Sequence, residues 1–162
     1  MGKLIKFRSA GANDLDAAWM FGGLERVAVV FEDLDPIAVN LGLNRTELQS
    51  YVERQLTQRG IPLATLAELE SSDDAAVVYV SVATEQHPSG PAAFMLSIQV
   101  CDVVTLARNP EQGGGVTTWL KNGVWITSPG ELKRDVLAAV DEGVKLLGEA
   151  MSEATSPSRD LR

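Results

Sequence analysis

The hydrophobic pattern is clearest between residues 24 and 63. The run Val27–Phe31 is short and continuously apolar, which predicts a strand covered on both faces in the interior of a sheet. Asn44 and, three positions later, Glu47 form a capping-box pattern, so we expect a helix to begin there. Its apolar positions recur at helical spacing and predict one packed stripe, namely Leu48, Tyr51, Val52 and Leu56.

Gly60 predicts the end of this helix at about Arg59, because glycine readily adopts the left-handed conformation that closes a helix. Ile61–Leu63 then begins a second predicted strand. A strand–helix–strand connection of this length is most simply a right-handed crossover. We therefore expect the second strand to lie parallel to the first.

Alternation of apolar and polar positions dominates the chain after residue 76. Three segments follow a period of two and predict strands at 77–85, 94–108 and 116–126. Turn-forming residues at 88–91 and 109–115 separate them, so we expect an antiparallel meander. The middle strand places one apolar set on one face: Phe94, Leu96, Ile98 and Val100. Its alternate positions give a mixed face for water or a partner, formed by Met95, Ser97, Gln99, Cys101, Val103 and Thr105.

The last predicted element is a long helix. Ser128, Pro129 and Glu131 combine an N-cap residue, a proline at the first helical position and a capping-box glutamate. The helical pattern continues to about Ser152. Its apolar stripe consists of Leu132, Val136, Val140, Val144, Leu147 and Met151.

These elements predict an α+β fold with the order β-α-β-β-β-β-α. We expect a two-layer sandwich in which the two main helices cover one face of a five-stranded mixed sheet. The length of 162 residues fits a single domain. We place this α+β domain at residues 23–152, after a loosely ordered N-terminal arm at 1–22 and before a disordered tail at 153–162.

Composition and charge narrow the classes of partner. The chain is acidic, with a formal net charge of −8, which opposes sequence-independent attraction to nucleic acid or anionic lipid. No segment approaches the ~20 apolar residues of a membrane-spanning helix. The chain has one histidine and one cysteine, so it lacks the residues of most catalytic or metal constellations, and we predict no cofactor.

The acidic loop after the first predicted strand is a candidate metal site. Glu32, Asp33 and Asp35 follow the carboxyl end of that strand, where open sheets with parallel strands commonly bind ligands. Their carboxylates are of the type that holds Mg²⁺ or Ca²⁺. The alternative is a solvated loop, since their spacing matches no calcium-binding motif.

Three polar or reactive side chains stand apart from these patterns. His87 lies at a predicted turn and is expected to be exposed. Cys101 lies in an apolar strand and is expected to be a packed or half-buried thiol. Asp102 interrupts an apolar face, so either a bulge turns it outward or it is a buried acid that pairs with Arg26 or Arg108.

Gln99, Trp119 and Trp125 are candidate binding residues. Gln99 belongs to the mixed face of the middle strand, and the two indoles lie along the last strand. Exposed indoles would form an apolar recognition surface of the kind found at interfaces. The alternative places both tryptophans in the core or at its edge.

The hydrophobic positions resemble those of a group of small, largely uncharacterised bacterial proteins. The residues that carry the resemblance are Gly23-Leu24, Val27, Val29, Val30, Leu43, Leu48, Val52-Glu53, Leu56, Gly60-Ile61, Val78–Val82, Gln99–Leu106 and Thr118-Trp119. Members of this group usually look exported, which implies a periplasmic location here. This chain shows no signal peptide, so it is expected to be cytoplasmic if the start as written is genuine.

The predicted architecture is also similar to small α/β domains of bacterial envelope-assembly lipoproteins, which bind partners and catalyse nothing. The leading hypothesis is therefore a non-catalytic binding or assembly module of the cell envelope that binds a protein partner or a second copy of itself as a homodimer. One alternative is a metal-assisted hydrolase or phosphoryl-transfer enzyme that uses Glu32, Asp33 and Asp35. Another is binding of a small apolar ligand between sheet and helices.

Overall fold

The computed structural model describes residues 20–69, 71–88, 90–106 and 108–155, and its chain order is strand, three helices, three strands, one helix. A 3₁₀ turn at Pro129–Glu131 precedes the last helix. The other elements are β1 (Arg26–Phe31), α2 (Pro36–Asn40), α3 (Arg45–Gln58), α4 (Leu66–Leu69), β2 (Ala75–Gln86), β3 (Ala92–Leu106), β4 (Asn109–Thr127) and α5 (Leu132–Thr155). The predicted arm at 1–22 and tail at 153–162 lie mostly outside the described residues, although Met20 and Phe21 are buried in the core.

The strands form one mixed sheet with the order β1-β2-β3-β4. β1 is parallel to β2, and the two remaining pairs are antiparallel. The α+β prediction and the antiparallel meander are therefore confirmed. The sheet has four strands, so the prediction of five was wrong.

The strand predicted at Ile61–Leu63 is reduced to one parallel bridge between Leu63 and Val27. The amide of Val27 donates to the Pro62 carbonyl at 3.0 Å, and the amide of Ala64 donates to the Val27 carbonyl at 2.8 Å. Pro62 has no N–H, so it cannot donate to a longer ladder. The predicted parallel direction is correct, but the chain turns away into α4 after this contact.

The turn predicted at 109–115 was also wrong, because β4 already begins at Asn109. Gly113, Gly114 and Gly115 pair with β3 residues Thr105, Val104 and Val103. Glycine weakens a strand but does not forbid one, and here the ladder continues through the whole triplet.

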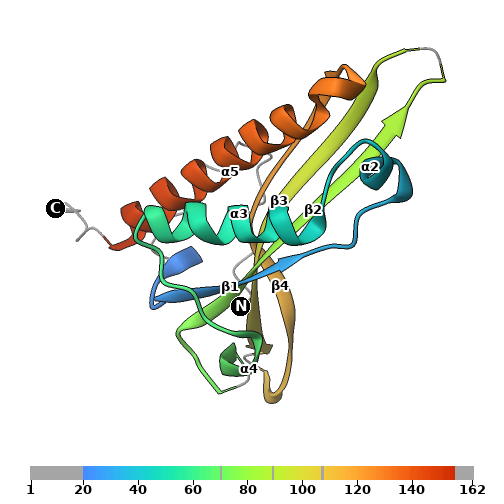
Figure 1. The fold of residues 1–162 in the computed structure, drawn as a ribbon. Helices are drawn as coiled ribbons and strands as arrows, with labels where there is room; N and C mark the ends of the chain where they lie inside the picture. Colours follow the sequence, from blue (N-terminus) through green and yellow to red (C-terminus); the bar gives the residue numbers. More distant parts are fainter. Residues whose placement is uncertain (1–19, 70, 89, 107, 156–162) are drawn as a thin grey trace, which may run out of the picture.

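Helices α3 and α5 lie beside each other over one face of the sheet (Figure 1). The predicted caps of α3 are present: Asn44 Oδ1 accepts from the Glu47 amide at 3.0 Å, and Gly60 has a φ of 77°. All six predicted stripe residues of α5 are buried. The start of α5 differs from the prediction, since Ser128 begins the 3₁₀ turn and its hydroxyl donates to Glu131 Oε2 at 2.8 Å.

The core lies between these two helices and the face of the sheet beneath them. Aliphatic side chains dominate it, as the low aromatic content requires. The buried strand residues on this covered face are Val27, Val29, Phe31, Val78, Val80, Val82, Phe94, Leu96, Ile98 and Val100. Alternate strand residues point to the opposite face, which neither α3 nor α5 covers and which we call the open face.

Candidate functional site

β4 is an edge strand, with β3 as its only neighbour in the described sheet. It runs for 19 residues, whereas strands in globular proteins average about 5–6. An edge strand presents a row of backbone N–H and C=O groups that can pair with another chain. The long free edge of β4 is therefore a candidate surface for strand addition.

Exposed apolar side chains lie beside this edge on the open face. The exposed fractions are 46% for Leu120, 70% for Val124, 77% for Ile126 and 45% for Met95. Met95 of β3 is directly opposite Val124 of β4, and Leu120 lies on the same face of β4 on the other side of Asn122. We call Leu120, Val124, Ile126 and Met95 the edge patch. Contiguous apolar surface of this kind marks interaction sites in soluble proteins.

The part of β4 that carries the edge patch has one charge of the kind that protects edge strands, and it lies on the covered face rather than on the edge patch. Natural edge strands usually carry charged residues or proline, which discourage pairing with other chains. Between Val116 and Thr127 the only charged residue is Lys121, and there is no proline. Lys121 pairs with Ile98, so it belongs to the covered face and leaves the edge patch uncharged.

The β3–β4 pair continues beyond β2 as a distal arm, which we define as residues 102–116. β2 pairs with β3 only as far as Cys101, so in the described sheet the two strands of the arm pair only with each other. Isolated two-stranded hairpins are marginally stable. Four apolar side chains on the arm are at least 37% exposed: Val103, Val104, Leu106 and Val116. Val103 is on the same face of β3 as Met95 and extends the edge patch, whereas Val104, Leu106 and Val116 point to the opposite face of the arm.

The predicted binding residues Gln99, Trp119 and Trp125 are divided between the two faces of the sheet. Gln99 is half-buried on the open face, where its Oε1 accepts from Thr117 Oγ1 at 3.2 Å. Trp119 is buried on the covered face, and Trp125 is half-buried on the same face. The Trp125 ring stacks on Phe94 with centroids 5.1 Å apart. The structure thus places both indoles at the core and brings neither next to Gln99.

The three acidic residues of the candidate metal site point to different partners. Both carboxylate oxygens of Asp35 accept a hydrogen bond from a backbone amide at 2.7 Å. Oδ1 accepts from Ala38 at the start of α2, and Oδ2 accepts from Thr84 of β2. Asp33 is almost fully exposed and pairs with Arg45 at 3.3 Å. Partial burial, followed by a hydrogen bond with Glu32, raises the pKa of the Tyr79 hydroxyl. Within the described ranges no group of three His, Cys, Asp or Glu side chains is arranged to hold a metal ion.

The other singled-out side chains have local roles. His87 is exposed at the β2–β3 turn, as predicted. Cys101 is half-buried, with its Sγ 3.9 Å from Thr117 Oγ1. The ladder has an irregularity between Val100 and Cys101, next to the predicted bulge, and Asp102 accepts from the Val103 amide at 2.7 Å.

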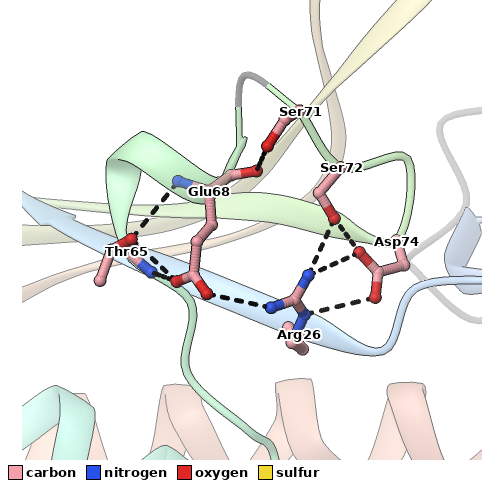
Figure 2. A network of polar contacts seen from close by, with 6 residues as sticks. All are labelled: Arg26, Thr65, Glu68, Ser71, Ser72 and Asp74. Carbon is pink, nitrogen blue, oxygen red and sulfur yellow. Dashed lines mark hydrogen bonds and ion pairs between the residues drawn. The ribbon is translucent and has the colours of Figure 1, made fainter.

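Arg26 is the centre of a polar network at the start of β1 (Figure 2). Its guanidinium donates to Asp74 at 3.0 and 3.3 Å, to Ser72 at 2.9 Å and to Glu68 at 3.4 Å. Glu68 also accepts from the Thr65 amide at 2.7 Å and so caps α4. The network joins α4 and the turn before β2 to β1, and its charges are paired with one another, which indicates a structural role.

We expect acid to loosen this network first. The hydrogen bond from Arg26 lowers the pKa of Asp74, and the Thr65 backbone amide followed by the Thr65 hydroxyl lowers the pKa of Glu68. A carboxyl group whose pKa is lower in the folded than in the unfolded chain stabilises the fold at pH values above its unfolded pKa of about 4. This stabilisation is lost as the pH falls through the folded pKa. The protection of α4 amides from exchange, relative to the unfolded chain at the same pH, should therefore fall below about pH 4. In Arg26→Gln the protection of α4 amides should be lower at pH 7 and should change less with pH. An unchanged dependence of protection on pH would contradict this role.

A shallow groove lies between the end of α3 and the C-terminal part of α5. Arg59, Gly148 and Ser152 contribute to both of its hollows. Arg59 is already engaged with Asp141 at 3.1 Å and with Gln55 at 2.9 Å. The groove has charged side chains of both signs, which does not match the apolar lining typical of a small-ligand site.

The comparisons with known proteins show no family. No protein-family model matches the chain, and no curated protein matches it. A minor lipoprotein from Acinetobacter baumannii is 13% identical with a TM-score of 0.35, over 79% of this chain and 92% of that one. A PelC dodecamer from Paraburkholderia phytofirmans is 15% identical with a TM-score of 0.41, over 83% and 90% of the two chains. None of the described helices is long and apolar enough to cross a membrane.

The edge patch was not predicted from the sequence. The alternating pattern assigned the open-face residues of β3 to a surface for water or a partner, but it did not single out Leu120, Val124 and Ile126. The sequence does contain a signal for it. Trp119 and Trp125 occupy one face of a period-two pattern, and the residues of the other face include apolar Leu120, Val124 and Ile126. Which strand lies at the edge depends on strand order, which this local signal does not contain.

Proposed function

We propose that this protein is a non-catalytic binding or assembly module that acts through the exposed side of β4. The observation that carries the proposal is the edge patch beside the outer edge of β4. In the described sheet this edge has no strand partner, and β4 contains no acidic residue between Val116 and Thr127. Pairing along the edge would supply backbone hydrogen bonds, and burial of the patch would supply hydrophobic stabilisation.

The proposed place of action is the bacterial cell envelope. This part of the proposal follows from the resemblance of the sequence to a group of usually exported proteins. Fractionation of cells that express the protein from its native locus tests it, because an envelope module should be recovered with the periplasm or membranes. Recovery in the cytoplasmic fraction alone would contradict the proposed location without affecting the binding surface.

A photo-cross-linking residue at Val124 tests the binding surface. In cells that produce the protein, we expect covalent adducts of defined mass between this residue and the binding partner, since Val124 is at the centre of the edge patch. The matched control is the same residue at Glu142, which is exposed on α5. Equal cross-linking at the two positions, or none at Val124, would contradict the proposal.

Metal-assisted hydrolysis or phosphoryl transfer at Glu32, Asp33 and Asp35 is still untested. In the described structure both oxygens of Asp35 are occupied by backbone amides, so the geometry gives this activity no specific support. Calorimetry with Mg²⁺, Mn²⁺ and Ca²⁺ tests it directly.

A further inference from the structure

We propose that the occupant of the β4 edge is a second copy of this chain, paired antiparallel around a two-fold axis that passes beside Asn122. This inference rests on the proposed binding function and specifies its partner. The two sheets would join into one continuous sheet of eight strands, twice the four of a single chain. Both edge patches would then lie on the same open face and meet across the new strand pair.

The sequence of β4 is complementary to itself in this register. Residues that face each other across the axis have numbers equally distant from 122. Leu120 of one copy is then opposite Val124 of the other. The two-fold axis creates this contact twice, once with each copy contributing Leu120. Directly opposite apolar side chains are the main stabilising pairs of antiparallel sheets. Two of the four patch residues of each copy would contact the other copy in this way.

The covered face of the same pairing avoids a charge conflict. Lys121 of one copy is opposite Gly123 of the other, which has no side chain. A Cβ atom on Gly123 would be 2.4 Å from the Trp125 ring, so that indole lies directly over Gly123. The ammonium group of Lys121 would therefore lie beside an aromatic ring, a favourable arrangement. An axis beside Lys121 itself would instead place the two ammonium groups opposite each other, which is destabilising.

The charge distribution favours a second copy at this surface over other parts of the molecule. Two chains of net charge −8 repel each other where their acidic residues meet. The solvent-facing side of α5 carries exposed Glu142, Glu149 and Glu153. β4 between Val116 and Thr127 has no acidic residue, so two copies can approach there without that repulsion.

The expected dimer is weak. A stable interface buries about 800 Å² on each partner, and one strand pair with a few apolar side chains falls short of this area. Sedimentation of the wild-type protein should therefore show a monomer–dimer equilibrium that depends on concentration. Val124→Asp should weaken the dimer about tenfold, because each of the two symmetry-related Leu120–Val124 contacts would then set a carboxylate against an apolar side chain. Its melting temperature should stay close to that of the wild type, since Val124 is 70% exposed. A wild-type protein that stays monomeric at millimolar concentration would overturn the inference.

Single cysteines on the open face test the register. In a Cys101→Ser background, Asn122→Cys should form a disulfide-linked dimer under mild oxidation, because the two positions meet at the axis. Leu120→Cys, Val124→Cys and Ile126→Cys are matched controls on the same face of the same strand. Ile126 is opposite Thr118 of the second copy, so its two cysteines would be far apart. Equal yields at all four positions, a maximum at another position, or no dimer would overturn the inference.

The two proposals fail differently. If the cysteine dimer is absent while the Val124 cross-linker captures a different protein reproducibly, the second copy is wrong and the binding function stands. If the cross-linker captures nothing and the cysteines form no dimer, both proposals are wrong.

Discussion

Phe94→Ala is expected to lower the free energy of unfolding by about 3–5 kcal/mol, the usual range for a buried phenylalanine. Phe94 is 1% exposed on the covered face of β3. Its ring stacks on Trp125 with an interplanar angle of 12°, so the substitution leaves a cavity and removes the support of an indole. Urea unfolding followed by far-ultraviolet circular dichroism measures the loss.

Met95→Ala is the matched control for this prediction. Met95 is the next residue of β3 but points to the open face and is 45% exposed, so its loss should cost less than about 1 kcal/mol. Equal destabilisation by the two substitutions would show that the covered face of β3 is not the core. The control also removes part of the edge patch, and a weaker dimer with nearly normal stability would agree with the proposed interface.

The second large effect is expected at Asp35. Asp35→Ala removes the α2 cap, worth about 0.5–2 kcal/mol, and leaves the Thr84 amide without its acceptor, at about 1–3 kcal/mol. The sum should lower the free energy of unfolding by about 1.5–5 kcal/mol. Asp35→Asn should have a smaller effect, because its amide oxygen can still cap α2 while its NH₂ group cannot accept from Thr84. Thermal or urea unfolding of both variants gives the comparison.

Adding Mg²⁺ separates this structural role from a metal-binding role. If Asp35 acts through its two backbone contacts, the loss of stability in each variant should be the same with Mg²⁺ as without it. If Asp35 is a metal ligand, Mg²⁺ should stabilise the wild type and leave Asp35→Ala unchanged. This second outcome would contradict our assignment and would favour the acidic-loop alternative.

The sequence predicted best those features that are set by nearby residues. The Asn44–Glu47 cap, the Gly60 stop and the buried stripe of α5 depend on contacts within a few turns of helix, and the structure contains all three. The α2 helix was not predicted, although Asp35 before Pro36 is an N-cap followed by a proline at the first helical position. Its five residues are too few for a hydrophobic period to be recognised.

Features that depend on long-range pairing were harder to predict. Ile61–Leu63 has the composition of a strand, but the missing N–H of Pro62 and the turn into α4 reduce it to one bridge. Gly113–Gly115 has the composition of a turn, but β3 is long enough to pair with it. The faces of Trp119 and Gln99, and the exposure of Val124, follow from register and strand order, which a local pattern does not define.

The two edges of the sheet differ, and this limits how far an assembly can grow. The outer edge of β1 is closed by the contacts of Val27 with residues 62–64 and by Arg45, whose Nε donates to the Phe31 carbonyl at 2.7 Å. Beyond the end of β1, Asp35 accepts a hydrogen bond from the Thr84 amide on the same side of β2. A copy that has joined through β4 would therefore present a β1 edge that is blocked near both of its ends. If two copies pair through β4 as proposed, the blocked β1 edge would favour a closed pair over continued strand addition along that edge.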